Sequence, residues 1–208
     1  MNPLDILVIE DKNKYDASIA QVSDLGHHVD IARNLVEASE FLGYQRARLC
    51  GSQISPKRYD VVLTDLMFPL GGSMFDIIAI DDEDQRHEEA PLGFAIVLRA
   101  ARQGVPYIAV VTDLNHHKGP IAASLDLLYA SDDREELCKI PETQHRPTFK
   151  INNSKVRLFD IRDLPALSLL KDGRICEGPC NEEEMKLCLH PLKNYKAALE
   201  RLMDYEGK

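Results

Sequence analysis

The sequence predicts an α/β fold in which helices cover both faces of a parallel sheet. Three short aliphatic runs support this prediction, at residues 6–9, 61–64 and 108–111. Continuous apolar runs of this length are typical of strands buried on both faces, as in parallel sheets. Segments with helical spacing of apolar residues lie between the runs, and this alternation favours a doubly wound sheet.

Individual residues mark where the predicted elements begin and end. Gly26 and Gly104 are suitable helix stops, Asn34 is a suitable helix cap, and the Asp-Gly pair at 172–173 indicates a hairpin turn. We expect strands at 6–11, 28–32, 59–65, 107–112, 156–161 and 186–190, and helices at 13–25, 35–49, 91–103, 120–129 and 194–204.

The chain of 208 residues is long enough for one large domain, so we expect a single domain over 1–208 with two insertions. The regular pattern breaks first at about 70–90, where an acidic run at 81–89 is typical of a solvated loop. It breaks again at about 132–184, where periodicity is weak.

Composition excludes several classes of partner. The net charge of −9 and the pI near 5.3 argue against direct nucleic-acid binding, since no broad basic face is available. The N-terminal residues do not resemble a signal peptide, and no uncharged run approaches the length of a membrane span. Five cysteines without an export signal indicate reduced thiols, so we expect a cytoplasmic protein that does not contact membranes.

Acidic residues follow two of the aliphatic runs. Glu10 and Asp11 come directly after the run at 6–9, and Asp65 follows the run at 61–64. Ligands of open parallel sheets bind beyond the carboxyl ends of the strands, so these carboxylates are expected to converge. Such a cluster repels itself unless a cation or a proton neutralises it, and oxygen ligands favour Mg²⁺. Any one of these residues alone could simply be polar because its strand reaches water there.

Four segments in order, 6–11, 25–29, 59–69 and 104–112, resemble the receiver domain of two-component response regulators. The resemblance covers 5–69 and 91–131 and is weak over 132–185. It implies a flavodoxin-like, doubly wound sheet of five parallel strands in the order 2-1-3-4-5, with the two insertions added to it.

The resemblance also implies a phosphorelay, in which a sensor histidine kinase or another signalling protein is the partner and Asp65 accepts the phosphoryl group. Glu10 and Asp11 would hold Mg²⁺ together with Asp65 and the backbone carbonyl of Met67. Thr112 matches the hydroxyl that turns towards the bound phosphoryl group. Any catalysis would be limited to phosphoryl acceptance and self-dephosphorylation.

The sequence departs from the family pattern at two positions. Receivers carry a lysine at the end of strand five, and His190 occupies the corresponding place here, with Lys193 nearby as a substitute. A histidine pairs with phosphate only when protonated. Asp113 follows the hydroxyl where a small residue is usual, and its charge would repel a phosphoryl group.

Three alternatives remain open. The domain could be a pseudo-receiver that binds proteins without phosphorylation. A small phosphatase using the same carboxylates is disfavoured, because Met67 stands where the usual second aspartate would be. Cys176, Cys180 and Cys188, with His190, could hold Zn²⁺, although their spacing is not a familiar motif and free cysteines are the simpler interpretation.

Overall fold

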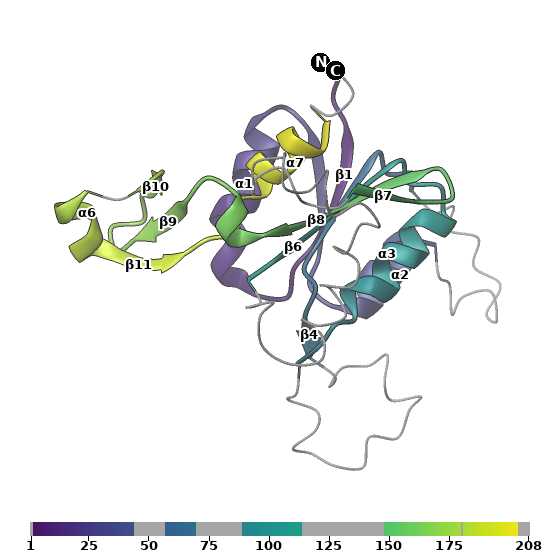
Figure 1. The fold of residues 1–208 in the computed structure, drawn as a ribbon, viewed down its shortest axis with the longest axis horizontal. Coiled ribbons are helices and arrows are strands. Elements are labelled where there is room, and N and C mark those ends of the chain that lie inside the picture. Colours follow the sequence, from purple (N-terminus) through teal and green to yellow (C-terminus); the bar gives the residue numbers. More distant parts are fainter. Residues whose placement is uncertain (1, 44–56, 70–88, 114–147, 180, 204–208) are drawn as a thin grey trace, which may run out of the picture.

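The computed structural model describes residues 2–43, 57–69, 89–113, 148–179 and 181–203 (Figure 1). The fold is α/β, with a mostly parallel central sheet of six strands in the order β2-β1-β3-β6-β8-β7. Its strands are β1 (Asp5–Ile9), β2 (His28–Ala32), β3 (Val61–Thr64), β6 (Tyr107–Thr112), β7 (Thr148–Ile151) and β8 (Ser154–Asp160). All neighbouring pairs are parallel except β7 and β8.

The prediction of five strands is wrong, because antiparallel β7 adds a sixth at the edge. The strand beside β6 is β8, and not the segment at 186–190 that we expected. Arg157 interrupts the apolar pattern of β8, but the strand is otherwise mostly buried. The segment near 186–190 alternates between half-buried and exposed residues, which does not suit a central strand.

Strand alternation gives the sheet two apolar faces. Ile6 and Val8 belong to a core cluster with α1 (Asp16–Asp24) and α7 (Tyr195–Met203), whereas Leu7 and Ile9 belong to a cluster with α2 (Leu35–Phe41) and α3 (Gly93–Arg102). Figure 1 shows these two helix pairs on opposite sides of the sheet. The 3-10 turn η1 (Asn13–Tyr15) precedes α1.

A small three-stranded antiparallel sheet projects from the main domain, at the left of Figure 1. We call residues 167–191 the arm. It comprises β9 (Leu167–Leu170), β10 (Ile175–Glu177), α6 (Glu182–Leu187) and β11 (Cys188–Pro191). The predicted turn at 172–173 joins β9 to β10, with Gly173 at a φ of 85°. The arm returns the chain directly to α7.

The predicted helix cap is confirmed. The side chain of Asn34 accepts hydrogen bonds from the amides of Val36 and Glu37, so it caps α2 as expected.

The short strands β4 (Phe68–Pro69) and β5 (Glu89–Ala90) form a two-stranded sheet in the lower part of Figure 1. The expected helix at 120–129 and the acidic run, apart from Glu89, lie outside the described residues. None of the described helices is long and apolar enough to cross a membrane.

Gly93, at the start of α3, packs against the chain that follows β3. Its amide donates a 2.9 Å hydrogen bond to the carbonyl of Leu66. A Cβ at this position would overlap the Asp65 carbonyl oxygen and lie 2.8 Å from the Cα of Leu66. These are backbone atoms, so a side chain can be accommodated only if the strand end moves.

We therefore expect Gly93→Ala to lower the free energy of unfolding by about 2–3 kcal/mol, in the range of overpacked sites. Leu98→Ala is the control, because Leu98 on the same helix is 59 % exposed and its loss should cost less than about 0.5 kcal/mol. Chemical denaturation measures both values. Equal stability of Gly93→Ala and the wild type would show that the contact is loose.

Candidate functional site

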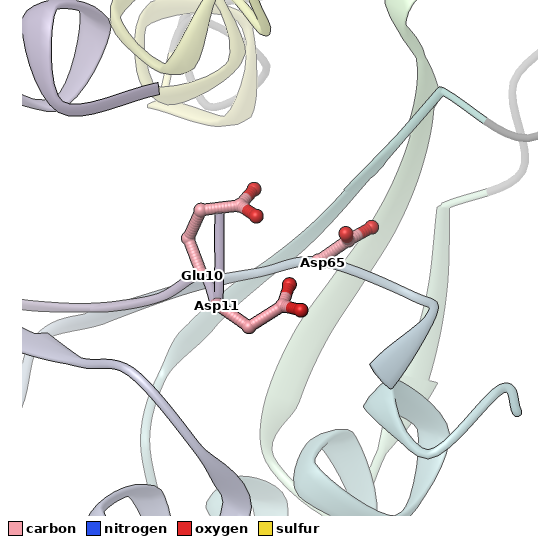
Figure 2. A group of neighbouring side chains, drawn as sticks. All are labelled: Glu10, Asp11 and Asp65. Atoms are coloured by element: carbon pink, nitrogen blue, oxygen red, sulfur yellow. The ribbon is translucent and has the colours of Figure 1, made fainter. Parts of the chain in front are cut away.

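The fold brings Glu10, Asp11 and Asp65 together. Strands β1 and β3 are parallel neighbours, with Ile9 opposite Thr64, so the residues that follow each strand emerge at the same edge. One ligand atom from each carboxylate lies within 4.8 Å of the others (Figure 2). The convergence predicted from the strand ends is therefore confirmed.

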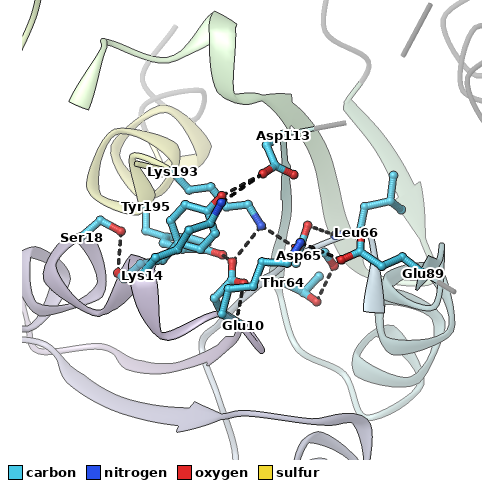
Figure 3. Close-up of polar contacts among 12 residues, drawn as sticks. Glu10, Lys14, Ser18, Thr64, Asp65, Leu66, Glu89, Asp113, Lys193 and Tyr195 are labelled. Carbon is cyan, nitrogen blue, oxygen red and sulfur yellow. Dashed lines mark hydrogen bonds and ion pairs between the residues drawn. The ribbon is translucent and has the colours of Figure 1, made fainter. Parts of the chain in front are cut away.

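A buried lysine lies among these carboxylates. Lys193 follows β11 and precedes α7, and its side chain is fully buried. Its Nζ lies 2.5 Å from Asp65 Oδ2 and 2.8 Å from Glu10 Oε2 (Figure 3). One ammonium group thus bridges two carboxylates, and the three acidic side chains have one lysine in direct contact.

Glu10 is held by three donors. Its Oε2 accepts from Lys193 and, at 2.7 Å, from the hydroxyl of Tyr195, while its Oε1 accepts from the amide of Lys12 at 3.1 Å. Burial, and then the charge of Glu10, raise the pKa of Tyr195 well above its usual value. The phenol therefore stays protonated and donates a hydrogen bond to Glu10.

Asp65 is fully buried at the end of β3. Its Oδ1 accepts a 2.6 Å hydrogen bond from the amide of Leu66. Burial raises the pKa of Asp65 to about 6; Lys193 opposes this shift and Glu10 adds to it. The carboxylate is therefore mostly ionised at neutral pH, and it becomes protonated under mildly acidic conditions.

Asp11 differs from its neighbours because its charge has less compensation. Its Oδ1 is buried and has no hydrogen-bond partner among the described residues. Burial raises its pKa, Lys12 lowers it and Asp65 raises it further. A bound hard cation would supply what this oxygen lacks, and the all-oxygen donor set suits such an ion.

One aromatic side chain, Tyr15, and one basic side chain, Lys14, lie at the rim of the acidic site, beside Asp113. The ring of Tyr15 lies under Lys193, with Nζ 4.6 Å from its centroid, and its hydroxyl donates a 2.8 Å hydrogen bond to Asp113. Lys14 is 3.8 Å from the same carboxylate. Burial alone would raise the pKa of Asp113, but Lys193 and Tyr15 hold it below its usual value. Asp113 is thus a charged member of the rim.

The remaining predicted residues lie in different surroundings. Thr112 is buried at the end of β6, at the same edge of the sheet as Asp65. The side chain of Met67 packs in the core on the α2–α3 face, which leaves only its backbone for the site. His190 lies in β11, with its Nε2 3.4 Å from the carbonyl oxygen of Lys14. The cation in contact with Asp65 is Lys193.

Sequence reasoning missed Tyr15 and Tyr195. Both are buried, and both belong to the core cluster on the α1–α7 face. From sequence alone they are indistinguishable from ordinary aromatic core residues of a helix and its preceding turn. Only the approach of α1 to α7 shows that their hydroxyls face acidic groups.

The cysteines of the proposed zinc site lie in the arm. Cys176 in β10 is buried, with its Sγ 3.5 Å from Glu184, and Cys188 in β11 is half-buried on the other side of β9. Cys180 lies outside the described residues. Among the residues that are described, Glu10, Asp11 and Asp65 form the only group of three or more potential metal ligands.

Comparison of the chain with protein-family models, curated proteins and solved structures gave no match. Any functional conclusion therefore depends on the geometry and chemistry of the acidic site.

The raised pKa of Asp65 predicts a pH-dependent stability. The folded protein holds this proton more tightly than the unfolded chain, whose value is near 3.8, so stability falls as pH rises from about 4 to about 6. In cation-free buffer, the free energy of unfolding of the wild type should fall by up to about 3 kcal/mol over this pH range. Asp65→Asn should not show this fall.

Asp30→Asn is the control for this experiment. Burial alone would raise the pKa of Asp30, but hydrogen bonds from Lys57 and Tyr59 lower it overall. Its contribution is therefore lost as pH falls, which is the opposite sign. If wild type and Asp65→Asn differ by the same amount at every pH from 4 to 6.5, the pKa of Asp65 is not raised by folding and the prediction is wrong.

Proposed function

We propose that the protein is a receiver-like signalling domain that accepts a phosphoryl group on Asp65, with Mg²⁺, in a cytoplasmic two-component phosphorelay. The observation that carries this proposal is the juxtaposition of Asp65 with Asp11 on one side and Lys193 on the other. These groups supply a nucleophile, an oxygen ligand for a cation and a fixed positive charge.

The sheet gives the proposal further support. The observed order differs from that of a five-stranded flavodoxin-like sheet because β7 is added at the edge. The parallel strands alone, numbered in chain order, run 2-1-3-4-5. This arrangement places the ends of β1 and β3 side by side, where such sheets bind their ligands.

The proposed reaction is a transfer to a carboxylate. An ionised oxygen of Asp65 attacks the phosphorus of the donor, the bond to the leaving group breaks, and the leaving group departs with the bonding electron pair. Glu10, Asp11, Asp65 and the carbonyl of Met67 would hold the cation, which would neutralise charge on the transferred oxygens. Lys193 would pair with the new phosphoryl group, and the Thr112 hydroxyl would approach it as the switch.

The alternative function is a pseudo-receiver that acts as a protein-interaction module. One observation favours it: the Asp65 side chain has no exposed surface, so a donor reaches it only after the pocket opens. The arm would supply the contact surface, because Met185 and Leu189 are 59 % and 55 % exposed. The sensor histidine kinase remains the partner under the first proposal.

Incubation with Mg²⁺ and acetyl phosphate should add one phosphoryl group to the wild-type protein, since the ionised Asp65 is a competent nucleophile. The adduct should be cleaved by hydroxylamine, as acyl phosphates are. Asp65→Asn or removal of Mg²⁺ with a chelator should abolish it. Intact-mass spectrometry reads all four results.

Asp60→Asn is the matched control, because Asp60 precedes the same strand and its Oδ2 accepts from the amide of Asp5, a bond that asparagine can keep. This variant should be labelled like the wild type. Absence of any adduct on a wild-type protein that also fails to bind Mg²⁺ would favour the interaction module.

A further inference from the structure

A partly exposed ion pair lies beside the acidic site. The Nζ of Lys12 is 2.9 Å from Glu89 Oε1, and the two side chains are 27 % and 42 % exposed. Lys12 directly follows Asp11 in the chain, whereas Glu89 lies in β5. The pair therefore joins the loop after β1 to the small sheet of β4 and β5. Figure 3 shows Glu89 on the same side of the site as Asp65 and Leu66.

The backbone at each end of this ion pair is fixed close to the site. The amide of Lys12 donates a 3.1 Å hydrogen bond to Glu10 Oε1. Glu89 is paired with Pro69 of β4, and β4 begins three residues after Asp65. The ion pair thus connects the two chain segments that carry Glu10 and Asp65.

The ammonium group of Lys12 also lies close to the acidic residues. Burial alone would lower the pKa of Lys12, but the hydrogen bond and charge of Glu89, and then the charges of Asp113 and Asp65, raise it. Burial raises the pKa of Asp11, and Lys12 opposes this shift. Glu89 therefore holds a positive charge next to the acidic cluster.

The side chains around Asp65 differ in their exposure. Lys193 and Glu10 have no exposed surface, and neither does Asp65 itself. Lys12 and Glu89 are partly exposed, so they stand between the buried carboxylates and the solvent. The outer boundary of the site therefore includes this ion pair.

We propose that the Lys12–Glu89 ion pair is a latch that closes the entrance to Asp65, and that the pair separates before a phosphodonor reaches the carboxylate. Partly exposed ion pairs change an equilibrium by about two- to fivefold, so the latch opens readily. This inference rests on the proposed function for its donor, whereas closure of the entrance can be measured without phosphorylation.

Amide exchange at Leu66 measures access to Asp65, because this amide donates to Asp65 Oδ1 at 2.6 Å. Lys12→Met and Glu89→Gln each remove one partner of the latch, so we expect each to accelerate the exchange by about two- to fivefold. A simple charge effect predicts opposite changes, because the two variants alter the net charge with opposite signs. NMR spectroscopy of the full chain in cation-free buffer measures the exchange.

The double variant Lys12→Met/Glu89→Gln separates the two explanations further. It has the net charge of the wild type but no latch, so its Leu66 amide should still exchange about two- to fivefold faster than that of the wild type. Wild-type exchange in the double variant, opposite changes in the single variants, or no change in either would overturn the proposal.

Asp172→Asn is the control for the loss of an exposed ion pair. Asp172 pairs with Arg174 at 2.8 Å in the arm, and this variant should leave the Leu66 amide unchanged. The amide of Val62, within β3, reports on the stability of the whole sheet and should exchange equally in all variants.

Both single variants should also be phosphorylated about two- to fivefold faster by acetyl phosphate at saturating Mg²⁺, because the donor meets an open entrance more often. Intact-mass spectrometry measures these rates. If the wild type is phosphorylated and opening the latch does not accelerate the reaction, the latch does not control donor access and the proposal is wrong. A wild type that accepts no phosphoryl group contradicts the proposed function, and Leu66 exchange then decides the closure alone.

Discussion

The contact between Lys193 and two buried carboxylates is the interaction on which the site depends. Glu10 and Asp65 have no exposed surface, and neither does Lys193. Burial of an isolated charge costs several kcal/mol, so the carboxylates can stay ionised there only with a compensating charge. One lysine cannot neutralise three acidic groups. Burial is the main cause of the raised pKa of Asp65, and the charge of Glu10 raises it further. Within the described residues, Asp11 Oδ1 is buried without a hydrogen-bond partner.

The rest of the fold keeps this lysine in place. Lys193 lies in a short connection between β11 and α7, and the Leu192 amide donates to the carbonyl of Leu167 at 2.7 Å. At the other end of α7, Lys155 and Arg157 from β8 donate to its last carbonyls. Positive charge at a helix C-terminus is favourable, so β8 fixes the helix that carries Tyr195. Contacts with β9 of the arm before Lys193, and of β8 with α7 after it, therefore hold the segment that carries the lysine.

The sequence predicted the parallel strands of the first half and the convergence of Glu10, Asp11 and Asp65, because buried strands have a simple apolar pattern and end at one edge. It failed where polar residues lie within the core. A strand was expected at 156–161, but Arg157, which donates to the carbonyl of Arg201, breaks its apolar pattern, so this segment was not recognised as the strand beside β6. Lys193 was considered only as a substitute for His190, because charge within a core depends on partners 183 and 128 positions away.

The most direct measurement is a double-mutant cycle between Lys193 and Asp65, read by chemical denaturation in cation-free buffer at neutral pH. Removing only the lysine with Lys193→Met leaves buried carboxylates unpaired, and we predict a loss of about 3–5 kcal/mol. Adding Asp65→Asn should restore much of that stability, with a coupling free energy of at least about 2 kcal/mol. Additive effects of the two substitutions would show that the pair does not interact, and would contradict a site organised around the buried lysine.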